Sequence, residues 1–477
     1  MSNTTDLPAE EERVKRNVPP WVVLALVCMA QFMVVLDVSV VNVALPAIAA
    51  DLKVEAEGLQ WIVNAYVLTS AGFLLLGGRA ADLFGRKLVF ILGLVLFSVS
   101  SLVGGFADTP GVLIAARAVQ GLGAAVLSPA TLTILTTTFA DGPMRARAIA
   151  TWGAVGAAGG AAGSVVGGVL TDLVSWRWIL LINVPIGAVA VAVALLALAE
   201  SRDATRARRL DVTGAVLVTL GLTALEYGLV GTHDHGWGSA RALVPMIVGA
   251  LALAAFVLWQ ARFAAAPLMP LRIFRSRSVT GANLVQFLLG VAGFAVWYFL
   301  SLYMQNVLGY TAIQAGLAFI PHTTMIIIAS KSTPRLVARF GFRPLLVVGA
   351  LISASGFLWQ AQITPGSGLV TGVLLPGMLI TGGMGLTFAP IAMAATSGVS
   401  HDEAGLVSGV LNSSRQVGGS LGLAALATVS TTHTASLAAG TPAPAALTAG
   451  YALAFLVCAG VLLAAAAAVF ALPRARA

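Results

Sequence analysis

The chain has 477 residues, of which 58% are hydrophobic and only 10% are charged, and its mean hydropathy is +0.93. Soluble globular domains carry about 25% charged residues, so this composition excludes an ordinary soluble protein and predicts an all-α polytopic membrane protein. The net charge of +8 would suit a nucleic-acid-binding protein, but the basic residues are distributed as a membrane protein distributes them, and no nucleic-acid partner is expected.

Runs of about 20 apolar residues, the length that crosses a bilayer as a helix, occur roughly fourteen times along the chain. The predicted spans are 21–46, 58–78, 88–107, 111–137, 146–171, 176–199, 211–231, 242–261, 279–305, 312–334, 345–363, 370–396, 404–430 and 447–472. With the N-terminus inside, the outer loops contain only three basic residues, Lys53, Arg177 and Arg241. Since Lys and Arg are enriched in cytoplasmic loops, both termini are expected in the cytoplasm.

Two pairs of similar segments indicate an internal repeat. "ADLFGRKLVFILG" (81–93) resembles "VARFGFRPLLVVGA" (337–350), and "QGLGAAVLSPATL" (120–132) resembles "TGGMGLTFAPIAM" (381–393). Such symmetry is typical of two related helix bundles, which accounts for twelve spans and leaves two in the middle. The predicted organisation is a cytoplasmic tail (1–20), a six-helix bundle (21–200), a linker with two extra transmembrane helices (201–278), a second six-helix bundle (279–472) and a cytoplasmic tail (473–477).

One acid lies inside the first span, in "QFMVVLDVSVVNVALPAI" (31–48). A charge near the bilayer centre costs at least roughly 2.5–3.5 kcal/mol, so it normally faces a cavity or a partner. At ~1.5 Å per residue, Asp37 lies in the outer half of its span, and Arg117 lies about 9 Å below the outer surface in the fourth. Because the two depths overlap, we expect a pair in which Asp37 loads and releases a proton. The alternative is a fixed ion pair that only holds the outer half together.

Three further polar residues lie within spans. Glu226, in the outer half of the first extra span, is either a proton or substrate site or a partly wetted residue beside the loop "THDHGWGS". Arg415 lies about 18 Å into its span, with Asn412 on the same helix face, and we expect a polar cluster that faces a cavity rather than a structural one. His322 is either a core histidine or a cavity residue.

Two segments are expected to control conformational change. In the loop "GGRAADLFGRK" (77–87), Asp82 is predicted to accept hydrogen bonds from a neighbouring helix N-terminus or to pair with Arg86, and so to lock one arrangement of the bundles. In "GAVGAAGGAAGSVVGG" (153–168), glycines recur every four residues and open a smooth groove for close helix contact. The predicted gating residues are Gly78, Asp82, Gly85, Arg86, Lys87, Gly159, Gly163 and Gly167.

Four segments together resemble the major facilitator superfamily, and within it the fourteen-span drug:proton antiporters of the EmrB/QacA type. These are "LDVSVVNVALPAI", "GRAADLFGRK", "RAVQGLGAA", and "GSVVGGVL" followed by "WRWILLINVPIG". The resemblance implies that Asp37 carries the proton and that Arg117 takes part in coupling. The chain departs from the antiporter signature at Ser164, where a proline is usual, which puts the geometry of the fifth span in question.

The resemblance implies a proton-coupled secondary transporter, not an enzyme, that exports amphipathic or cationic drugs by alternating access between two bundles. The expected proton-coupling residues are Asp37, Arg117 and Glu226, and the expected cavity residues are Asp37, Asn42, Gln120, Glu226, His322, Asn412 and Arg415. No metal or other cofactor is expected beside the proton gradient, and the transporter is expected to act as a monomer in a bacterial inner membrane. The alternatives are a dedicated exporter of one natural product, a proton-coupled importer and, more remotely, a membrane enzyme or sensor.

Overall fold

The computed structural model describes residues 18–139, 142–200, 210–236, 238–399, 401–437 and 440–473. Both predicted tails, apart from 18–20 and 473, and the basic segment 201–209 of the predicted linker lie outside the described residues. Within the described part of the chain the structure is all-α, as predicted. Among the described residues, thirteen helical stretches are long and apolar enough to cross a membrane, some of them made of two consecutive helices. The other predicted span is α15, which has 37 residues but carries the polar sequence "NSSRQVGGS".

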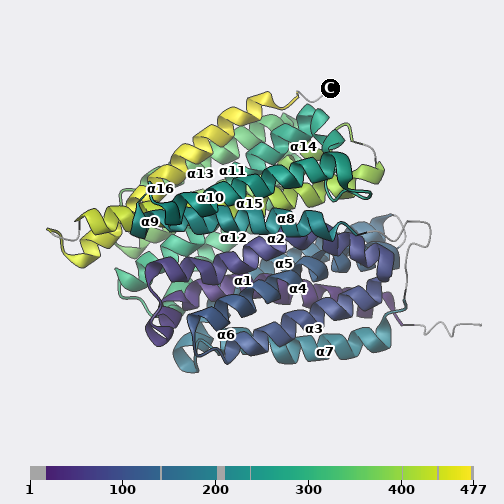
Figure 1. Cartoon of the computed structure of the whole chain (residues 1–477), viewed down its shortest axis with the longest axis horizontal. Coiled ribbons are helices and arrows are strands. Elements are labelled where there is room, and N and C mark those ends of the chain that lie inside the picture. The colour runs from purple at the N-terminus through teal and green to yellow at the C-terminus, as the bar shows by residue number, and fades with distance from the viewer. Residues whose placement is uncertain are drawn as a thin grey trace, which may run out of the picture.

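The helices form two bundles with a helix pair between them (Figure 1). The N-terminal bundle contains α1 (Pro20–Leu52), α2 (Ala56–Phe84), α3 (Arg86–Gly105), α4 (Pro110–Thr138), α5 (Pro143–Leu173), α6 (Trp178–Leu181) and α7 (Asn183–Ala197). The C-terminal bundle contains η2 (Leu271–Arg275), α11 (Arg277–Asn306), α12 (Ala312–Phe340), α13 (Phe342–Gln360), η3 (Val370–Leu374), α14 (Leu375–Thr396), α15 (His401–Leu437), α16 (Ala443–Ala468) and η4 (Val469–Ala471).

The two extra spans form a hairpin of α8 (Val212–Val230), the short α9 (Thr232–His235), α10 (Ala240–Leu258) and η1 (Trp259–Phe263). Asp211 holds its open end together, because its carboxylate accepts from the backbone N–H of Gly214 (2.8 Å) and from Nε1 of Trp259 (2.7 Å). The first bond caps α8, and the second ties it to η1. Because α8 packs against α2 of one bundle and α15 of the other, the hairpin lies across the boundary between the bundles.

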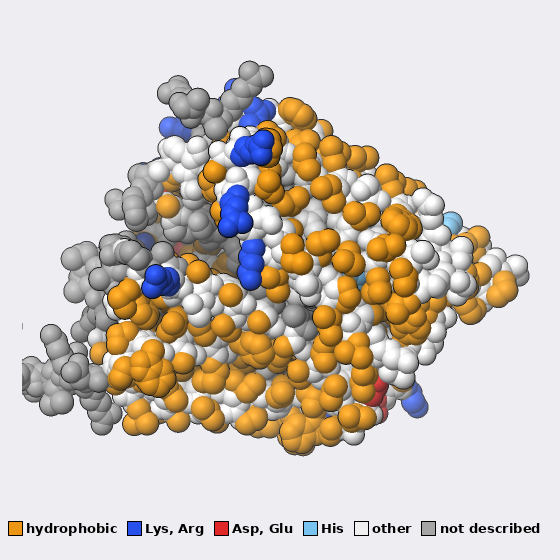
Figure 2. Space-filling model, turned by 180° about the vertical axis from the view of Figure 1, so that it is seen from behind, with side chains coloured by type: hydrophobic (Ala, Val, Ile, Leu, Met, Phe, Trp, Pro, Cys, Tyr) orange, Lys and Arg blue, Asp and Glu red, His pale blue; other side chains and the backbone are white. Residues whose placement is uncertain are grey.

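We call the end where α1 begins the inner end and the end where it finishes the outer end, after the orientation expected from the basic loops. At the outer end the bundles are joined by Oγ of Ser301 on α11, which donates to the carbonyl of Asn42 on α1 (2.9 Å), and by Nε2 of Gln305, which donates to the carbonyl of Val43 (3.0 Å). At the inner end Figure 2 shows a hollow between the two halves, with Lys and Arg side chains along its edge. The bundles are therefore closed at the outer end.

Candidate functional site

The structure brings Asp37 and Arg117 together in the interior of the N-terminal bundle. Asp37 is 0% exposed and Arg117 is 1% exposed, and Nη1 of Arg117 lies 2.5 Å from Oδ2 of Asp37. α1 supplies the acid and α4 supplies the base. A charge-assisted bond of this length in a dry environment is strong, so the two charges compensate each other where neither is solvated.

The other carboxylate oxygen of Asp37 accepts two amide hydrogen bonds. Nε2 of Gln120, one turn after Arg117 on α4, and Nδ2 of Asn183, the first residue of α7, each lie 2.7 Å from Oδ1. Both amides also bond to Oγ of Ser101 on α3, at 2.7 Å and 3.3 Å. Three helices therefore meet at one carboxylate, and α3 joins them through the two amides. Neither Asn183 nor Ser101 was among the predicted site residues, although Asn183 lies in "WRWILLINVPIG", a segment that resembles the superfamily.

Arg117 has acceptors besides the carboxylate. Its Nε donates to the backbone carbonyl of Ile62 (3.1 Å), its Nη1 donates to Oε1 of Gln120 (2.6 Å), and its guanidinium carbon lies 4.4 Å from the centre of the Tyr66 ring. A cation over an aromatic face is stabilised by the ring quadrupole. Arg117 therefore keeps two hydrogen bonds and a cation–π contact if Asp37 becomes neutral.

Glu226 is a second buried carboxylate, 0% exposed, and it lies between the two bundles. On the outer half of α8, it accepts from Nδ2 of Asn64 on α2 and from Oγ of Ser420 on α15, the latter at 2.7 Å. The extra hairpin is thus bonded to one helix of each bundle through a single acid. This geometry excludes the alternative that Glu226 is a partly wetted residue beside the loop "THDHGWGS", because its side chain lies inside the protein.

A cavity of about 190 Å³ lies between the bundles. α1 contributes Val38 and Asn42, α15 contributes Arg415, and α11, α12 and α14 supply the remaining walls. Nη2 of Arg415 donates to Oδ1 of Asn412, one turn earlier on α15 (2.9 Å). The predicted cluster therefore forms, with Arg415 in the cavity wall and Asn412 behind it, outside the lining residues. Val38 follows Asp37 directly on α1, so the same helix carries the buried acid and part of the cavity wall.

Four predicted cavity residues are placed elsewhere. Asp37 and Gln120 belong to the buried cluster, and Glu226 lies on α8 of the extra hairpin. His322, 1% exposed, packs between α12 and α14, where its Nε2 lies 3.2 Å from the carbonyl oxygen of Val373. Of the two alternatives for His322, a core histidine and a cavity residue, this position is that of a core histidine.

The loop after α2 is held by an acid that the sequence analysis did not name. Glu200, just after α7, accepts from the backbone N–H groups of Lys87 (3.2 Å) and Leu88 (3.1 Å) at the N-terminus of α3, and Nζ of Lys87 donates to the carbonyl of Leu195 (2.9 Å). Gly85 takes φ +112°, which few other residues adopt. Glu200 thus occupies the helix terminus that was predicted to receive Asp82, whose side chain lies outside those that the structure describes.

The remaining predicted gating residues also make contacts. Gly78 packs against Pro129 of α4, and Arg86 begins α3. The three glycines of α5 face α1 with almost no space between the helices: a Cβ at Gly159 would lie 2.9 Å from the carbonyl oxygen of Phe32, one at Gly163 would lie 2.6 Å from Cβ of Ser39, and one at Gly167 would lie 2.9 Å from Cα of Val40. The predicted groove therefore receives α1.

Ser164, at the position where the related signature has proline, makes two kinds of contact. Its Oγ lies 3.0 Å from Oγ of Ser39, which donates to the carbonyl of Gly160 (2.7 Å). Its backbone carbonyl faces Gly316 of α12, where an added Cβ would lie 2.2 Å from that oxygen. α5 runs as one helix through this point, and serine keeps here the backbone N–H that proline lacks.

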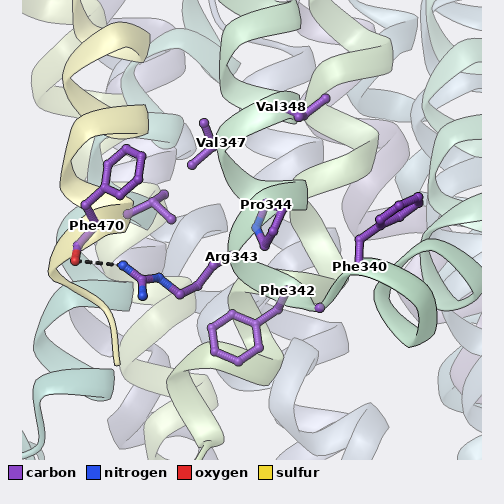
Figure 3. A pocket seen from close by; sticks show the side chains of 9 residues that line it. Phe340, Phe342, Arg343, Pro344, Val347, Val348 and Phe470 are labelled. Carbon is purple, nitrogen blue, oxygen red and sulfur yellow. Dashed lines mark hydrogen bonds between the residues drawn. The ribbon is translucent and has the colours of Figure 1, made fainter. Parts of the chain in front are cut away.

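A larger cavity of about 560 Å³ lies at the inner ends of α13 and α16 (Figure 3). Its walls are apolar apart from Arg343, which donates to the carbonyl of Phe470 (2.8 Å). Phe340 and Phe470 are 52% and 70% exposed. This cavity is therefore a surface groove on one bundle, and it shares no wall with the N-terminal bundle.

At the outer end, Asp172 joins α5 to α12. Its carboxylate accepts from the backbone N–H groups of Ala312 (3.3 Å) and Ile313 (2.8 Å), the first residues of α12. A carboxylate at a helix N-terminus contributes about 0.3–1 kcal/mol. Because acid and helix belong to different bundles, this contact stabilises outer closure only.

We therefore expect Asp172→Ala to open the outer end about two- to fivefold more often. The measurement is labelling by a membrane-impermeant maleimide, added from the outer side, of an Asn42→Cys reporter in the cavity wall; both native cysteines are buried. Asp108→Ala is the matched control, since that carboxylate is 90% exposed and its bond to Arg177 is 3.5 Å long. Equal labelling of both variants would show that Asp172 does not hold the outer end closed.

Comparison with known proteins matches this architecture. The family model described as Major Facilitator Superfamily matches residues 27–423. The chain is 49% identical over 422 residues to "Cephamycin export protein CmcT" of Amycolatopsis lactamdurans (88% of this chain, 86% of the relative), and 38% identical over 451 residues to "Puromycin resistance protein pur8" of Streptomyces alboniger (93% and 89%).

Among solved structures, an inward-facing, unoccupied bacterial homologue of the human lysosomal transporter Spinster superposes with a TM-score of 0.65 at 17% identity, covering 94% of this chain and 96% of that one. This likeness concerns the fold. Together with two helix bundles around a central cavity and the matched family model, it leads to one assignment: the chain belongs to the Major Facilitator Superfamily.

Proposed function

We propose that this protein is a proton-coupled exporter of small amphipathic organic compounds that works by alternating access. One observation carries the proposal: α1 holds a fully buried, ion-paired acid, Asp37, directly beside residues that line a cavity between the two bundles. A buried ionisable residue in a membrane span marks a proton or substrate pathway, and a cavity at the interface of two repeats is where such transporters bind substrate. The relatives named for export and resistance support the same activity.

In the proposed cycle, protonation of Asp37 from the outer side removes its attraction to Arg117 while substrate leaves outward. Arg117 keeps its hydrogen bonds to the carbonyl of Ile62 and to the amide oxygen of Gln120, and its cation–π contact with the Tyr66 ring. Movement of α1 then transmits the change to Val38 and Asn42 in the cavity wall. Release of the proton to the cytoplasm restores the ion pair and resets the site.

We propose that Glu226 is a second protonatable site that links the hairpin to this cycle. Its two donors, Asn64 and Ser420, come from opposite bundles, so rocking of the bundles must lengthen at least one of these bonds. A carboxylate that loses a donor in a dry environment is stabilised by taking up a proton. Glu226 would then share the coupling with Asp37.

The remaining parts of the proposal concern setting and substrate range. We place the protein in a bacterial inner membrane with both termini cytoplasmic, as a functional monomer driven by the proton gradient without a cofactor. A dedicated exporter of one natural product is the second candidate, favoured by the 49% identity to a protein named for cephamycin export. An importer on the same fold would move substrate in the opposite direction under the same gradient.

The test uses inside-out membrane vesicles with an acidic lumen, so that the lumen corresponds to the outside of the cell. Ethidium, puromycin, a cephamycin and an unrelated organic acid, dansyl-phenylalanine, are offered separately, and accumulation is compared with vesicles that lack the protein. We expect accumulation that collapses when a proton ionophore is added. Accumulation of one compound alone would favour the dedicated exporter. Failure of every compound to accumulate, or accumulation that persists without the gradient, contradicts proton-coupled export.

A further inference from the structure

Arg415 is the charged residue of the central cavity. Of the residues that line it, Arg415 alone carries a formal charge. It is half-buried on α15, and its recorded hydrogen bond goes to the neutral amide oxygen of Asn412 at 2.9 Å. Among the described residues Arg415 makes no ion pair, whereas Arg117, Arg177 and Arg272 each make one. A guanidinium without an anionic partner inside a membrane protein costs free energy. An anionic ligand that pairs with Arg415 would remove this cost, so the cavity favours the binding of anions.

The backbone that carries this cation is held by close packing. A Cβ at Gly290 of α11 would lie 2.3 Å from the backbone oxygen of Arg415, so α11 presses directly against the backbone that carries the guanidinium. Nη2 of Arg415 donates to Oδ1 of Asn412 on the same helix. The fork of donors is thus held at the wall before any ligand arrives, which reduces the entropy lost on binding.

Acids are absent from the lining residues. Asp37 and Glu226, the two buried carboxylates of the proposed cycle, are each 0% exposed and do not line the cavity. Each already accepts hydrogen bonds at both of its oxygens. An organic cation would therefore meet an uncompensated positive charge with no carboxylate to offset it. Like-charge contact in a site of low dielectric opposes binding, which argues against the cationic substrates expected from the family resemblance.

The rest of the wall is apolar or neutral. Leu289, Phe294, Trp297, Met384 and Phe388 supply flat or flexible apolar surface, and the neutral polar groups belong to Asn42, Gln286 and Thr387. A wall of aromatic and aliphatic residues with few polar groups binds an apolar body and orients it by those groups. The complementary ligand has an apolar, partly aromatic body and one acidic group.

We propose that the substrates are organic anions, and that Arg415 binds the substrate's carboxylate while the aromatic wall binds its apolar body. This proposal rests on the proposed export function, because an anion that binds in the cavity is a substrate only if the protein transports it. Arg415 is then the residue that sets charge selectivity. Because its guanidinium is a planar fork, it pairs with a carboxylate through two parallel bonds, which a lysine ammonium does not reproduce.

The test compares three ligands that share one fluorophore and differ in charge: dansyl-phenylalanine (anionic), dansyl-phenylalaninamide (neutral) and dansylcadaverine (cationic). Binding to the purified full chain is measured by fluorescence, which needs no gradient, so failed proton coupling leaves this result unaffected. A charge-assisted hydrogen bond contributes about 1.5–3 kcal/mol, so we expect the wild type to prefer the acid over the amide by about tenfold or more.

Two variants separate charge from geometry. Arg415→Gln is expected to abolish that preference, so that the acid and the amide bind with about equal affinity. Its affinity for the amide should stay within about twofold of the wild-type value, which also shows that the variant is folded. Arg415→Lys is expected to keep an intermediate preference because the charge remains and the fork is lost. The proposal is overturned if the wild type binds dansylcadaverine at least as tightly as the acid, or if Arg415→Gln leaves the preference for the acid unchanged.

Discussion

Replacing Asp37 by asparagine is expected to abolish proton-driven accumulation in inside-out vesicles while substrate–substrate exchange continues. The carboxylate is the group that takes up and releases the proton in the proposed cycle, and an amide does neither. Exchange of one substrate molecule for another requires no net proton movement, so it isolates alternating access from coupling. The two measurements on the same vesicles therefore distinguish a lost proton site from a lost transporter.

The local cost of this substitution follows from the geometry. Oδ2 of Asp37 faces Nη1 of Arg117, and Oδ1 faces the amide nitrogens of Gln120 and Asn183. Either orientation of an asparagine amide places an N–H against a donor, and an unsatisfied buried polar group costs about 1–3 kcal/mol. Thermal unfolding in detergent should show this destabilisation, which accompanies loss of coupling and does not by itself explain it.

Asn183→Ala is the matched control for Asp37→Asn. It removes one of the donors to Oδ1 and leaves Nε2 of Gln120 in place, so the protein loses part of the same stabilisation but keeps the carboxylate. We expect gradient-driven accumulation to persist in this variant. Accumulation that survives unchanged in Asp37→Asn, or that disappears equally in both variants, would remove Asp37 from the coupling mechanism.

Replacing Gly316 by leucine is expected to prevent the outer end from closing. A Cβ there would lie 2.2 Å from the backbone oxygen of Ser164 and 3.3 Å from Cα of Val165. These are backbone atoms of the opposite bundle, so the clash is relieved only if α5 and α12 separate. Overpacking costs about 1–3 kcal/mol, which corresponds to a shift of about 5- to 150-fold away from the outer-closed state.

The measurement is again maleimide labelling of the Asn42→Cys reporter from the outer side, together with transport. Labelling should rise and export should fall, while the unfolding temperature changes little, because Gly316 meets the other bundle rather than its own. Gly460→Leu on α16 is the control, since open space surrounds that glycine. Gly163→Leu should instead lower stability, because it clashes with α1 inside the N-terminal bundle. Unaltered labelling in Gly316→Leu would mean that this contact does not set the closed state.

Periodicity and charge located the helices well but not their ends. The predicted span 312–334 lies within α12, which continues to Phe340, and the predicted span 21–46 lies within α1, which continues to Leu52. Hydropathy reports the stretch that contacts lipid, whereas a helix continues as long as its backbone bonds are satisfied. The predicted span 176–199 contains two helices, α6 and α7, which meet at Ile182.

The sequence by itself determined the membrane class, the two bundles with an added helix pair, and the pairing of Asp37 with Arg117. Each of these follows from one-dimensional quantities: the length of apolar runs, the sides on which charges fall, and a fixed rise per residue. The pairing of Asp37 with Arg117 was predictable because both charges had to be compensated at the same depth.

Only the tertiary structure decided which polar residues share a site. Gln120 and Asn183 lie on two different helices and bond to the carboxylate of Asp37, Ser101 of a third helix bonds to both of their amides, and Glu226 joins Asn64 to Ser420 across the bundle boundary. The position of a residue along its helix could be predicted from the sequence, but the rotation of one helix against its neighbours could not. That rotation is set by how small residues let backbones approach, and it placed His322 in a helix contact and Arg415 at the cavity wall.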